Sequence, residues 1–165
     1  MAHHLVAGGG GFIGSHLVDA LVARGDTVTI VDNFVTGRRA NIAHMEAHPR
    51  VRIVEHDVTE PFPAHLADTP YDTVLDLASP ASPDDFRTMP LEILAVGSTG
   101  TRRLLDLAVL NRARFFLAST SEVYGDPLIH PQPESYLGNV SSIGPRSCYD
   151  EAKRCLLYTS PSPRD

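Results

Sequence analysis

The sequence predicts an α/β fold built on a doubly wound parallel sheet, and two observations carry this prediction. Amphipathic helical patterns cover Phe12–Ala23 and Met89–Val109. Short apolar runs lie around them, rich in β-branched or aromatic residues as buried parallel strands are, at residues 5–7, 28–31, 51–54, 73–78 and 115–118. Alternating strands and helices imply right-handed crossovers between parallel strands. We therefore expect an incomplete sheet of about five strands.

Each predicted helix has its own signals. The first places Ile13, Leu17 and Leu21 on one stripe and ends at Arg24-Gly25, because glycine readily ends a helix. The second begins at Pro90, which a first helical turn tolerates. Residues 125–146 are rich in Pro, Gly, Ser and Asn without periodicity, which predicts a long ordered loop over the strand ends.

Composition narrows the function classes. The chain has 165 residues, 42% of them hydrophobic, which suits one globular domain. A formal charge of -6 argues against a nucleic-acid surface, and no apolar run approaches the roughly 20 residues of a membrane span. With no leader pattern and only two cysteines, Cys148 and Cys155, we expect a cytoplasmic protein without disulfides. The adjacent His3 and His4 alternate sides along a strand, so we expect no metal site.

A glycine motif joins the first strand to the first helix. Gly8, Gly11 and Gly14 are three residues apart, and Phe12 and Ile13 open the helix. Missing side chains let the turn close and let backbone amides approach a pyrophosphate, whose charge the helix N-terminus stabilises. This context predicts a dinucleotide-binding Rossmann fold.

An acidic residue follows at the distance such a site requires. Asp32 ends the second strand 18 residues beyond Gly14, where an acid binds the adenine ribose, and Asn33 follows it. Because a carboxylate repels a 2′-phosphate, NAD is favoured over NADP although Arg38 and Arg39 lie nearby. Asp32 could instead merely cap the next turn. Further strand ends that could line an adenine or a ribose are Asp57 with Val58, and Leu77, Ala78 and Ser79.

Tyr149 and Lys153 form the candidate catalytic pair, and we expect both to bind the cofactor as well. Their i, i+4 spacing places them on one helix face, where an ammonium group favours the phenolate that can take a proton from a sugar hydroxyl. Thr120 and Glu122 follow the fifth strand and could orient the reacting hydroxyl and supply a carboxylate. The alternative is a polar cap at the strand end.

These residues make the chain resemble the extended short-chain dehydrogenases, the NAD-dependent epimerase/dehydratase family, and within it the enzymes that decarboxylate UDP-glucuronate. The resemblance covers residues 5–154. The motifs that carry it are Val31-Asp32-Asn33 with Thr36-Gly37-Arg38, the segment 77–83, residues 119–127, His130-Pro131-Gln132, and Ile143-Gly144-Pro145-Arg146 before Cys148 to Lys153.

The resemblance implies a reaction and further site residues. NAD would oxidise C4 of the sugar while Tyr149 takes the hydroxyl proton, and the resulting β-keto acid would lose carbon dioxide. The NADH formed would then return the hydride to C4 to give UDP-xylose. Thr36 and Gly37 would join the cofactor site. In the sugar-nucleotide 4,6-dehydratases an aspartate stands where this chain has Ser121, and because serine is a poor acid, Ser121 favours decarboxylation.

Alternatives stay open at this point. A dTDP- or UDP-sugar 4,6-dehydratase or a 4-epimerase is the enzymatic one, and a non-catalytic NAD-binding module is the one from another class. The resemblance also implies a nucleotide-sugar substrate and a homodimeric parent enzyme. No nucleic acid or membrane partner is expected.

We expect two segments of different origin. Residues 1–154 would form a truncated NAD-binding domain without the C-terminal substrate lobe, leaving the chain inactive alone and its fifth strand an exposed edge. Residues 155–165 change character abruptly and hold two prolines, which predicts that the helix begun at Tyr149 stops near Arg154. We expect this tail to be non-native and derived from a sequencing adapter.

Overall fold

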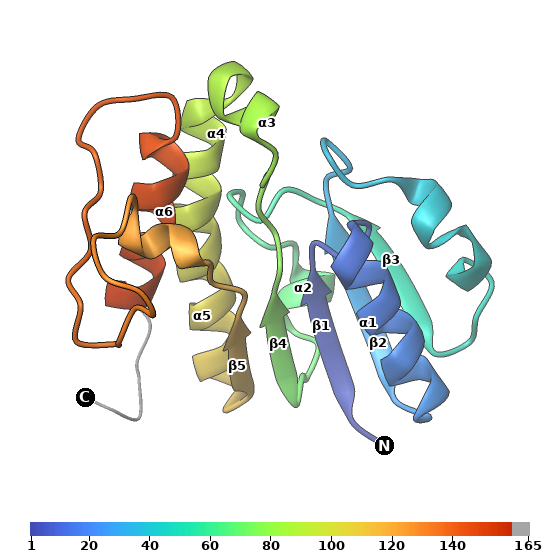
Figure 1. Cartoon of the computed structure of the whole chain (residues 1–165). Coiled ribbons are helices and arrows are strands. Elements are labelled where there is room, and N and C mark those ends of the chain that lie inside the picture. Colours follow the sequence, from blue (N-terminus) through green and yellow to red (C-terminus); the bar gives the residue numbers. More distant parts are fainter. Residues whose placement is uncertain (160–165) are drawn as a thin grey trace. The chain divides into compact units, whose positions relative to one another are not determined.

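A computed structural model of the chain describes residues 1–159, and the side chains of residues 1–157. Five strands form one sheet: β1 (His3–Ala7), β2 (Thr27–Asp32), β3 (Val51–Glu55), β4 (Thr73–Asp76) and β5 (Arg114–Leu117). Their order is β3-β2-β1-β4-β5, and every neighbouring pair is parallel (Figure 1). The predicted Rossmann-like parallel sheet with flanking helices is confirmed.

The chain divides into two compact units. The first, called here the sheet unit, comprises residues 1–78 and 99–118. The second, the helical unit, comprises residues 79–98 and the chain from residue 119 onward.

Helix α1 (Phe12–Ala23) packs on the sheet, in front of β1 and β2 in Figure 1. Its buried Val18 and Leu21 join Val28 and Ile30 of β2 in one apolar cluster. Burying such side chains stabilises the unit by roughly 1.5–3 kcal/mol each. The helix ends as predicted at Arg24, before Gly25 at φ +90°.

The other helices of the sheet unit are α2 (Ala64–Ala67) and α5 (Thr101–Asn111), with 3-10 turns at Arg39–Asn41 and Ala43–Met45. Helix α5 packs against β4 and β5. Within the described chain, β5 pairs with β4 alone, and Phe116 on it is 49% exposed. The fifth strand is therefore the edge that we predicted.

The helical unit contains α3 (Pro83–Thr88), α4 (Pro90–Ala95), the 3-10 turn η4 (Ser121–Tyr124) and α6 (Ser147–Thr159). Phe86 and Ile93 pack with Tyr149 and Ala152 in its core. Residues 125–146 hold no helix or strand beyond one bridge between Gly125 and Asn139. The prediction of an ordered loop there is confirmed.

The helix predicted over Met89–Val109 is present, since residues 90–111 are helical without a break, but its regularity was predicted wrongly. The structure has α4, a π-helical segment at Val96–Gly100 and then α5. At Gly97 a Cβ atom would stand 2.6 Å from the Cβ of Ala152, so the backbone passes α6 too closely for a side chain. This tertiary contact explains the irregular turn, since such single-turn π segments interrupt helices where local packing demands it.

The predicted helix end near Arg154 is also wrong, because α6 continues to Thr159. Leu156 lies on the same stripe as Tyr149, Ala152 and Lys153 and is only 2% exposed. Burial of Leu156 favours the helix beyond Arg154. Residues 160–165, with both prolines of the expected tail, lie outside the described residues. No described helix is both long and apolar enough for a membrane span.

Candidate active site

The glycine turn lies at the carboxyl end of β1. Gly8 has φ +79°, and a Cβ there would stand 2.7 Å from the carbonyl carbon of Leu77 and 2.8 Å from the nitrogen of Ala78. At Gly14 a Cβ would stand 2.1 Å from the Gly8 carbonyl oxygen. The first and third glycines of the motif are therefore sterically required, because the turn closes against its own helix and against the end of β4.

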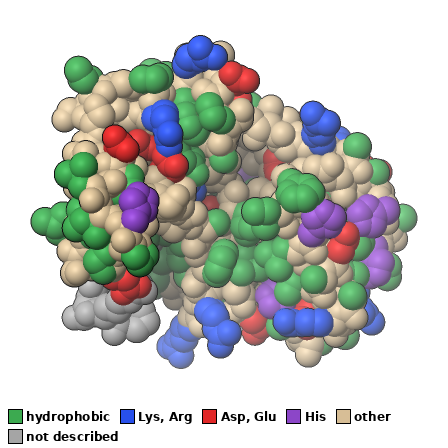
Figure 2. Space-filling model, in the orientation of Figure 1, with side chains coloured by type: hydrophobic (Ala, Val, Ile, Leu, Met, Phe, Trp, Pro, Cys, Tyr) green, Lys and Arg blue, Asp and Glu red, His purple; other side chains and the backbone are tan. Residues whose placement is uncertain are grey.

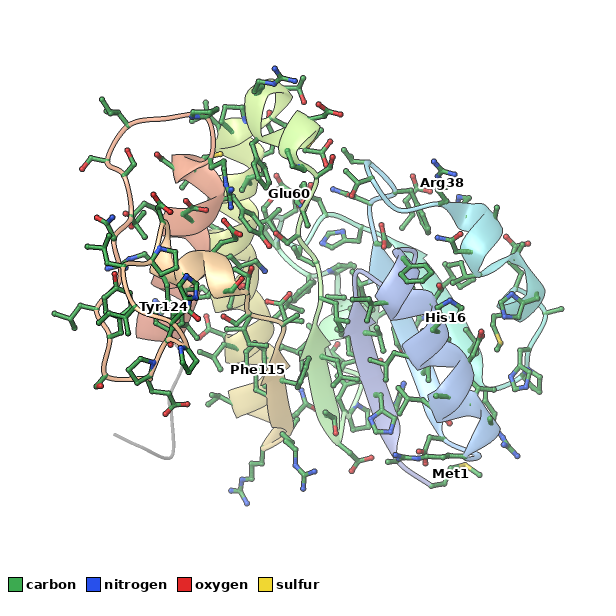
Figure 3. The ribbon with its side chains drawn as sticks, in the orientation of Figure 1. Met1, His16, Arg38, Glu60, Phe115 and Tyr124 are labelled. Carbon is green, nitrogen blue, oxygen red and sulfur yellow. The ribbon has the colours of Figure 1, made fainter. Side chains whose placement is uncertain are left out.

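The start of α1 presents backbone amides. Gly11 is the N-cap, none of the described side chains caps it, and the first turn carries no acidic residue. The positive end of the helix macrodipole is thus left for a phosphate. Phe12 and Ile13 are 76% and 69% exposed, and the Phe12 ring lies edge-on against His16, with 5.0 Å between ring centroids. His16 is labelled in Figure 3.

Asp32 faces the glycine turn. Its buried carboxylate accepts the Gly10 amide at 2.8 Å and the Phe34 amide at 2.8 Å. Gly37 passes so close that a Cβ there would stand 2.8 Å from Oδ1 of Asp32. The contact with Phe34 is the cap that we considered as an alternative, and the contact with Gly10 ties the same carboxylate to the predicted phosphate turn.

The Gly10 carbonyl oxygen accepts the Arg38 amide at 2.9 Å and Nδ2 of Asn41 at 2.8 Å (Arg38 is labelled in Figure 3). Sequence reasoning missed Asn41, which no local pattern marks. Arg39 forms an ion pair with Glu55, and its guanidinium lies 4.4 Å from the Phe34 ring centroid. Arg39 is thereby engaged within the protein.

The predicted residues at the end of β3 also come together. Asn33 donates to Asp57 at 2.9 Å, and the Thr59 hydroxyl and amide donate to Asp57 at 2.7 and 2.8 Å. Burial acts to raise the pKa of Asp57, but these hydrogen bonds outweigh it and hold the pKa below its ordinary value. Val58 is buried, whereas Thr36 is exposed on the turn after β2.

Asp76 holds the end of β4. It is buried, accepts the Thr101 hydroxyl at 2.7 Å and the Ala78 amide at 3.2 Å, and so fixes the backbone on which Gly8 closes. Ser79, predicted for the cofactor together with Leu77 and Ala78, begins the helical unit and donates to the Pro80 carbonyl.

The predicted catalytic pair lies within the helical unit. Tyr149 and Lys153 are both buried on α6, and Nζ of Lys153 lies 5.8 Å from the Tyr149 ring centroid. The Tyr149 ring stacks on Phe86, with centroids 4.7 Å apart and an interplanar angle of 17°. Phe86 is a supporting residue that sequence reasoning missed, and it fixes the plane of the phenol.

Thr120, Ser121 and Glu122 lie at η4, which packs against α6. The Thr120 hydroxyl accepts the Glu122 amide at 3.3 Å, so it caps η4 as the alternative interpretation allowed. Glu122 forms an ion pair with Arg146, and Ser121 is exposed. The helical unit therefore holds a phenol and an ammonium group on α6, and a hydroxyl and a carboxylate on the adjacent turn.

Comparison with known proteins gives one family. The family model described as GDP-mannose 4,6 dehydratase matches residues 5–159. UDP-glucuronic acid decarboxylase 1 of Arabidopsis thaliana is 51% identical over 150 residues, which are 91% of this chain and 33% of that protein. UDP-glucuronic acid decarboxylase 1 of Xenopus tropicalis is 49% identical over 159 residues, which are 93% of this chain and 37% of that protein. The chain thus spans about a third of the length of these relatives.

Solved structures agree. A dTDP-glucose 4,6-dehydratase from Streptomyces venezuelae with NAD bound superposes with a TM-score of 0.77 at 31% identity, covering 93% of this chain and 49% of that one. A Bordetella bronchiseptica enzyme in complex with NAD+ gives a TM-score of 0.79 at 28% identity, covering 96% and 52%. With a family match over almost its whole length, the chain belongs to the GDP-mannose 4,6 dehydratase family, within the NAD-dependent epimerases and dehydratases.

Proposed function

We propose that the protein to which this chain belongs is an NAD-dependent UDP-glucuronate decarboxylase that forms UDP-xylose. The observation that carries the proposal is the identity of about 50% to proteins named UDP-glucuronic acid decarboxylase, against 26–32% to solved 4-epimerases and 4,6-dehydratases. The exposed Ser121 supports it, since a dehydratase needs an acid to expel the C6 hydroxyl.

The sheet unit fits NAD. The glycine turn leaves no room for Cβ atoms at Gly8 and Gly14, and it adjoins a helix start without a side-chain cap. This arrangement suits a pyrophosphate. The residues that would hold the pyrophosphate are Gly8, Gly11, Phe12, Ile13 and Gly14. The Asp32 carboxylate would accept from ribose hydroxyls and repel a 2′-phosphate. When bound, NAD supplies a reversible hydride acceptor for C4 of the sugar.

The helical unit would move the protons. Tyr149, whose ring centroid lies 5.8 Å from Nζ of Lys153, would take the proton of the C4 hydroxyl. A ketone at C4 lies β to the C6 carboxylate, so the C5–C6 bond can break, with its electron pair passing into an enolate and carbon dioxide leaving. A proton must then be added at C5, and Glu122 would assist this exchange while Thr120 orients the hydroxyl. Finally C4 would regain the hydride, with the proton returned by Tyr149, which gives UDP-xylose and leaves NAD in its oxidised form.

The product of the complete protein decides between the enzymatic candidates. Incubation with UDP-glucuronate and NAD, followed by NMR spectroscopy, should give UDP-xylose and carbon dioxide. Tyr149→Phe should lower kcat by about 100-fold or more, because general base catalysis contributes on that scale. A 4-keto-6-deoxy sugar or a C4 epimer as the product would overturn the proposal in favour of a dehydratase or an epimerase.

NAD binding tests the sheet unit separately. Asp32→Asn should weaken NAD binding by about 10- to 100-fold in calorimetry, the range for hydrogen bonds to a charged group. Asp106→Asn is the control, because Asp106 is exposed on α5 and its carboxylate pairs with Arg102 on the same helix. Equal NAD affinity in Asp32→Asn and wild type would remove Asp32 from the cofactor site.

A further inference from the structure

In the helical unit one arginine, Arg146, lies near two carboxylates, those of Glu122 and Asp150. Arg146, from the loop before α6, forms an ion pair with Glu122 on η4. Both residues line an open hollow of ≈ 320 Å³, which Asp150 from the first turn of α6 also lines. Of these three charged residues, the reaction proposed above uses only Glu122.

Asp150 is a buried carboxylate with an unused acceptor. The residue is 7% exposed, and its Oδ1 has no hydrogen-bond partner within the described chain. Burial raises the pKa of Asp150, the Arg146 charge acts to lower it, and the charge of Glu151 acts to raise it. The charged form of Asp150 is therefore costly where it lies, because its burial is not offset by a hydrogen bond to Oδ1 from any described residue.

We propose that Arg146 is a positioning residue that holds Glu122 in its ionised, proton-accepting form, while the buried Asp150 takes up the proton that the hollow can store. The guanidinium is a permanent cation with a planar set of donors, so it can fix the direction of the Glu122 carboxylate as well as its charge. The catalytic consequence rests on the proposed function, whereas the arrangement of the three charged groups is independent of it.

Other charged groups lie close enough to contribute. Asp126 lines the same hollow, and Glu151 and Arg154 share α6 with Asp150 and form an ion pair at 3.9 Å. Arg154 also donates to the carbonyls of Val123 and Leu137. Of the elements packed against α6, η4 carries Glu122 and α4 carries Glu92, and Lys153 lies on α6 itself.

The charge arrangement can be measured on the chain itself. Carboxyl carbon NMR shifts followed against pH report Glu122 and Asp150 separately. In Arg146→Gln both pKa values should rise, that of Glu122 by about half a unit or more, since an adjacent cation lowers a carboxyl pKa by up to 1–3 units and partial exposure reduces this. In Asp150→Asn the pKa of Glu122 should stay the same or fall.

Arg102→Gln is the matched control, because it removes an exposed arginine from α5 and should move neither carboxyl. Arg146→Lys keeps the positive charge and should raise the pKa of Glu122 by less. This variant replaces Arg146→Gln in the measurement if Arg146→Gln does not fold. An unchanged Glu122 titration in both folded variants would overturn the proposal.

The complete protein tests the catalytic consequence. Arg146→Gln should lower kcat by about tenfold or more and move the acid limb of its pH profile upward, with KM for NAD unchanged. A lower kcat with an unmoved pH profile would mean a merely structural role and overturn the assignment. If the complete protein acts on a different sugar, the proposed function fails. The NMR measurement still decides whether the charge of Arg146 lowers the pKa values of Glu122 and Asp150.

Discussion

At the scale of single residues, Gly14 offers the sharpest steric test. Its missing Cβ would stand 2.1 Å from the Gly8 carbonyl oxygen, and backbone cannot withdraw as a flexible side chain can. Gly14→Ala should destabilise the chain by about 1–3 kcal/mol or more, the range for inserted methyl groups in packed sites. Urea unfolding followed by circular dichroism measures the change.

Gly11 gives the control on the same turn. A Cβ at Gly11 would meet only the Gly8 carbonyl oxygen, at 3.2 Å, so Gly11→Ala should cost clearly less than Gly14→Ala. Equal losses in the two variants would contradict this reading of the turn.

Asp26 makes the stability of the folded chain depend on pH in the acidic range. The hydrogen bonds from the Ala2 amide and the Arg24 side chain lower the pKa of Asp26 to about 2, from an ordinary value of 3.8. Because the folded chain holds the ionised form more strongly than the unfolded chain does, this contribution is complete above about pH 4 and disappears as the pH falls to about 2. Asp26→Asn should therefore show a smaller loss of stability between pH 5 and pH 3 than wild type.

Urea midpoints at the two pH values measure this difference, with Asp106→Asn as an exposed control that should follow wild type. If Asp26→Asn loses as much stability between pH 5 and pH 3 as wild type does, other carboxylates cause the acid sensitivity.

Residues whose role depends on local sequence could be predicted, and residues that meet distant partners could not. Gly8, Gly14 and Asp32 follow from a motif with fixed spacing between a strand and a helix. Asn41 reaches Gly10 across 31 residues, and Phe86 reaches Tyr149 from a different helix. Nothing near these two residues in the sequence indicates such contacts.

At the scale of elements, the apolar pattern and the glycine after its end predicted the bounds of α1 but not its buried face. Ile13 of the predicted stripe is 69% exposed, and the residues that the helix buries are Gly14, Ser15, Val18, Leu21 and Val22. Over Met89–Val109 the same periodicity predicted a helix but not its π-helical segment, which inserts without changing which residues are apolar. It failed again after Arg154, where the change of composition hid the buried Leu156.

Gly97 tests the cause of the π-helical segment. Gly97→Ala would place a methyl group 2.6 Å from the Cβ of Ala152, a short side chain that cannot turn away. Overpacking should outweigh the helix propensity of alanine and destabilise the protein by about 1–2 kcal/mol. Ser98→Ala in the same segment removes only an exposed hydroxyl that donates to Leu94 and should be near neutral.

Hydrogen exchange gives a second readout of Gly97→Ala. Amides of α6 around Ala152 should lose protection, while those of α1 in the sheet unit should not. Protection lost equally in α1 would point to general destabilisation rather than to a local clash.

At the scale of the whole molecule, the chain holds the cofactor turn and the Tyr149 and Lys153 pair but spans only 33–43% of its curated relatives. This length leaves most of those proteins' surface without a counterpart here, so we expect substrate binding to be incomplete. Our division at residue 154 remains a proposal, and the reading frame of the source DNA after codon 154 tests it. A native frame encoding residues 155–165 would contradict an adapter origin.

The 165-residue chain should therefore bind NAD but not turn over UDP-glucuronate. The contacts proposed for the pyrophosphate and adenine ribose of NAD lie within the sheet unit, where the glycine turn and Asp32 are already fixed by backbone and buried contacts, so calorimetry should detect binding that Asp32→Asn weakens. Decarboxylation needs the sugar held against Tyr149 in a productive geometry, and a loss of positioning alone removes many orders of magnitude in rate. Release of labelled carbon dioxide measures turnover, with the complete protein as the positive control. Turnover by the short chain at a tenth of the rate of the complete protein would mean that these 165 residues already hold the substrate, and that the additional length of its relatives serves some other purpose.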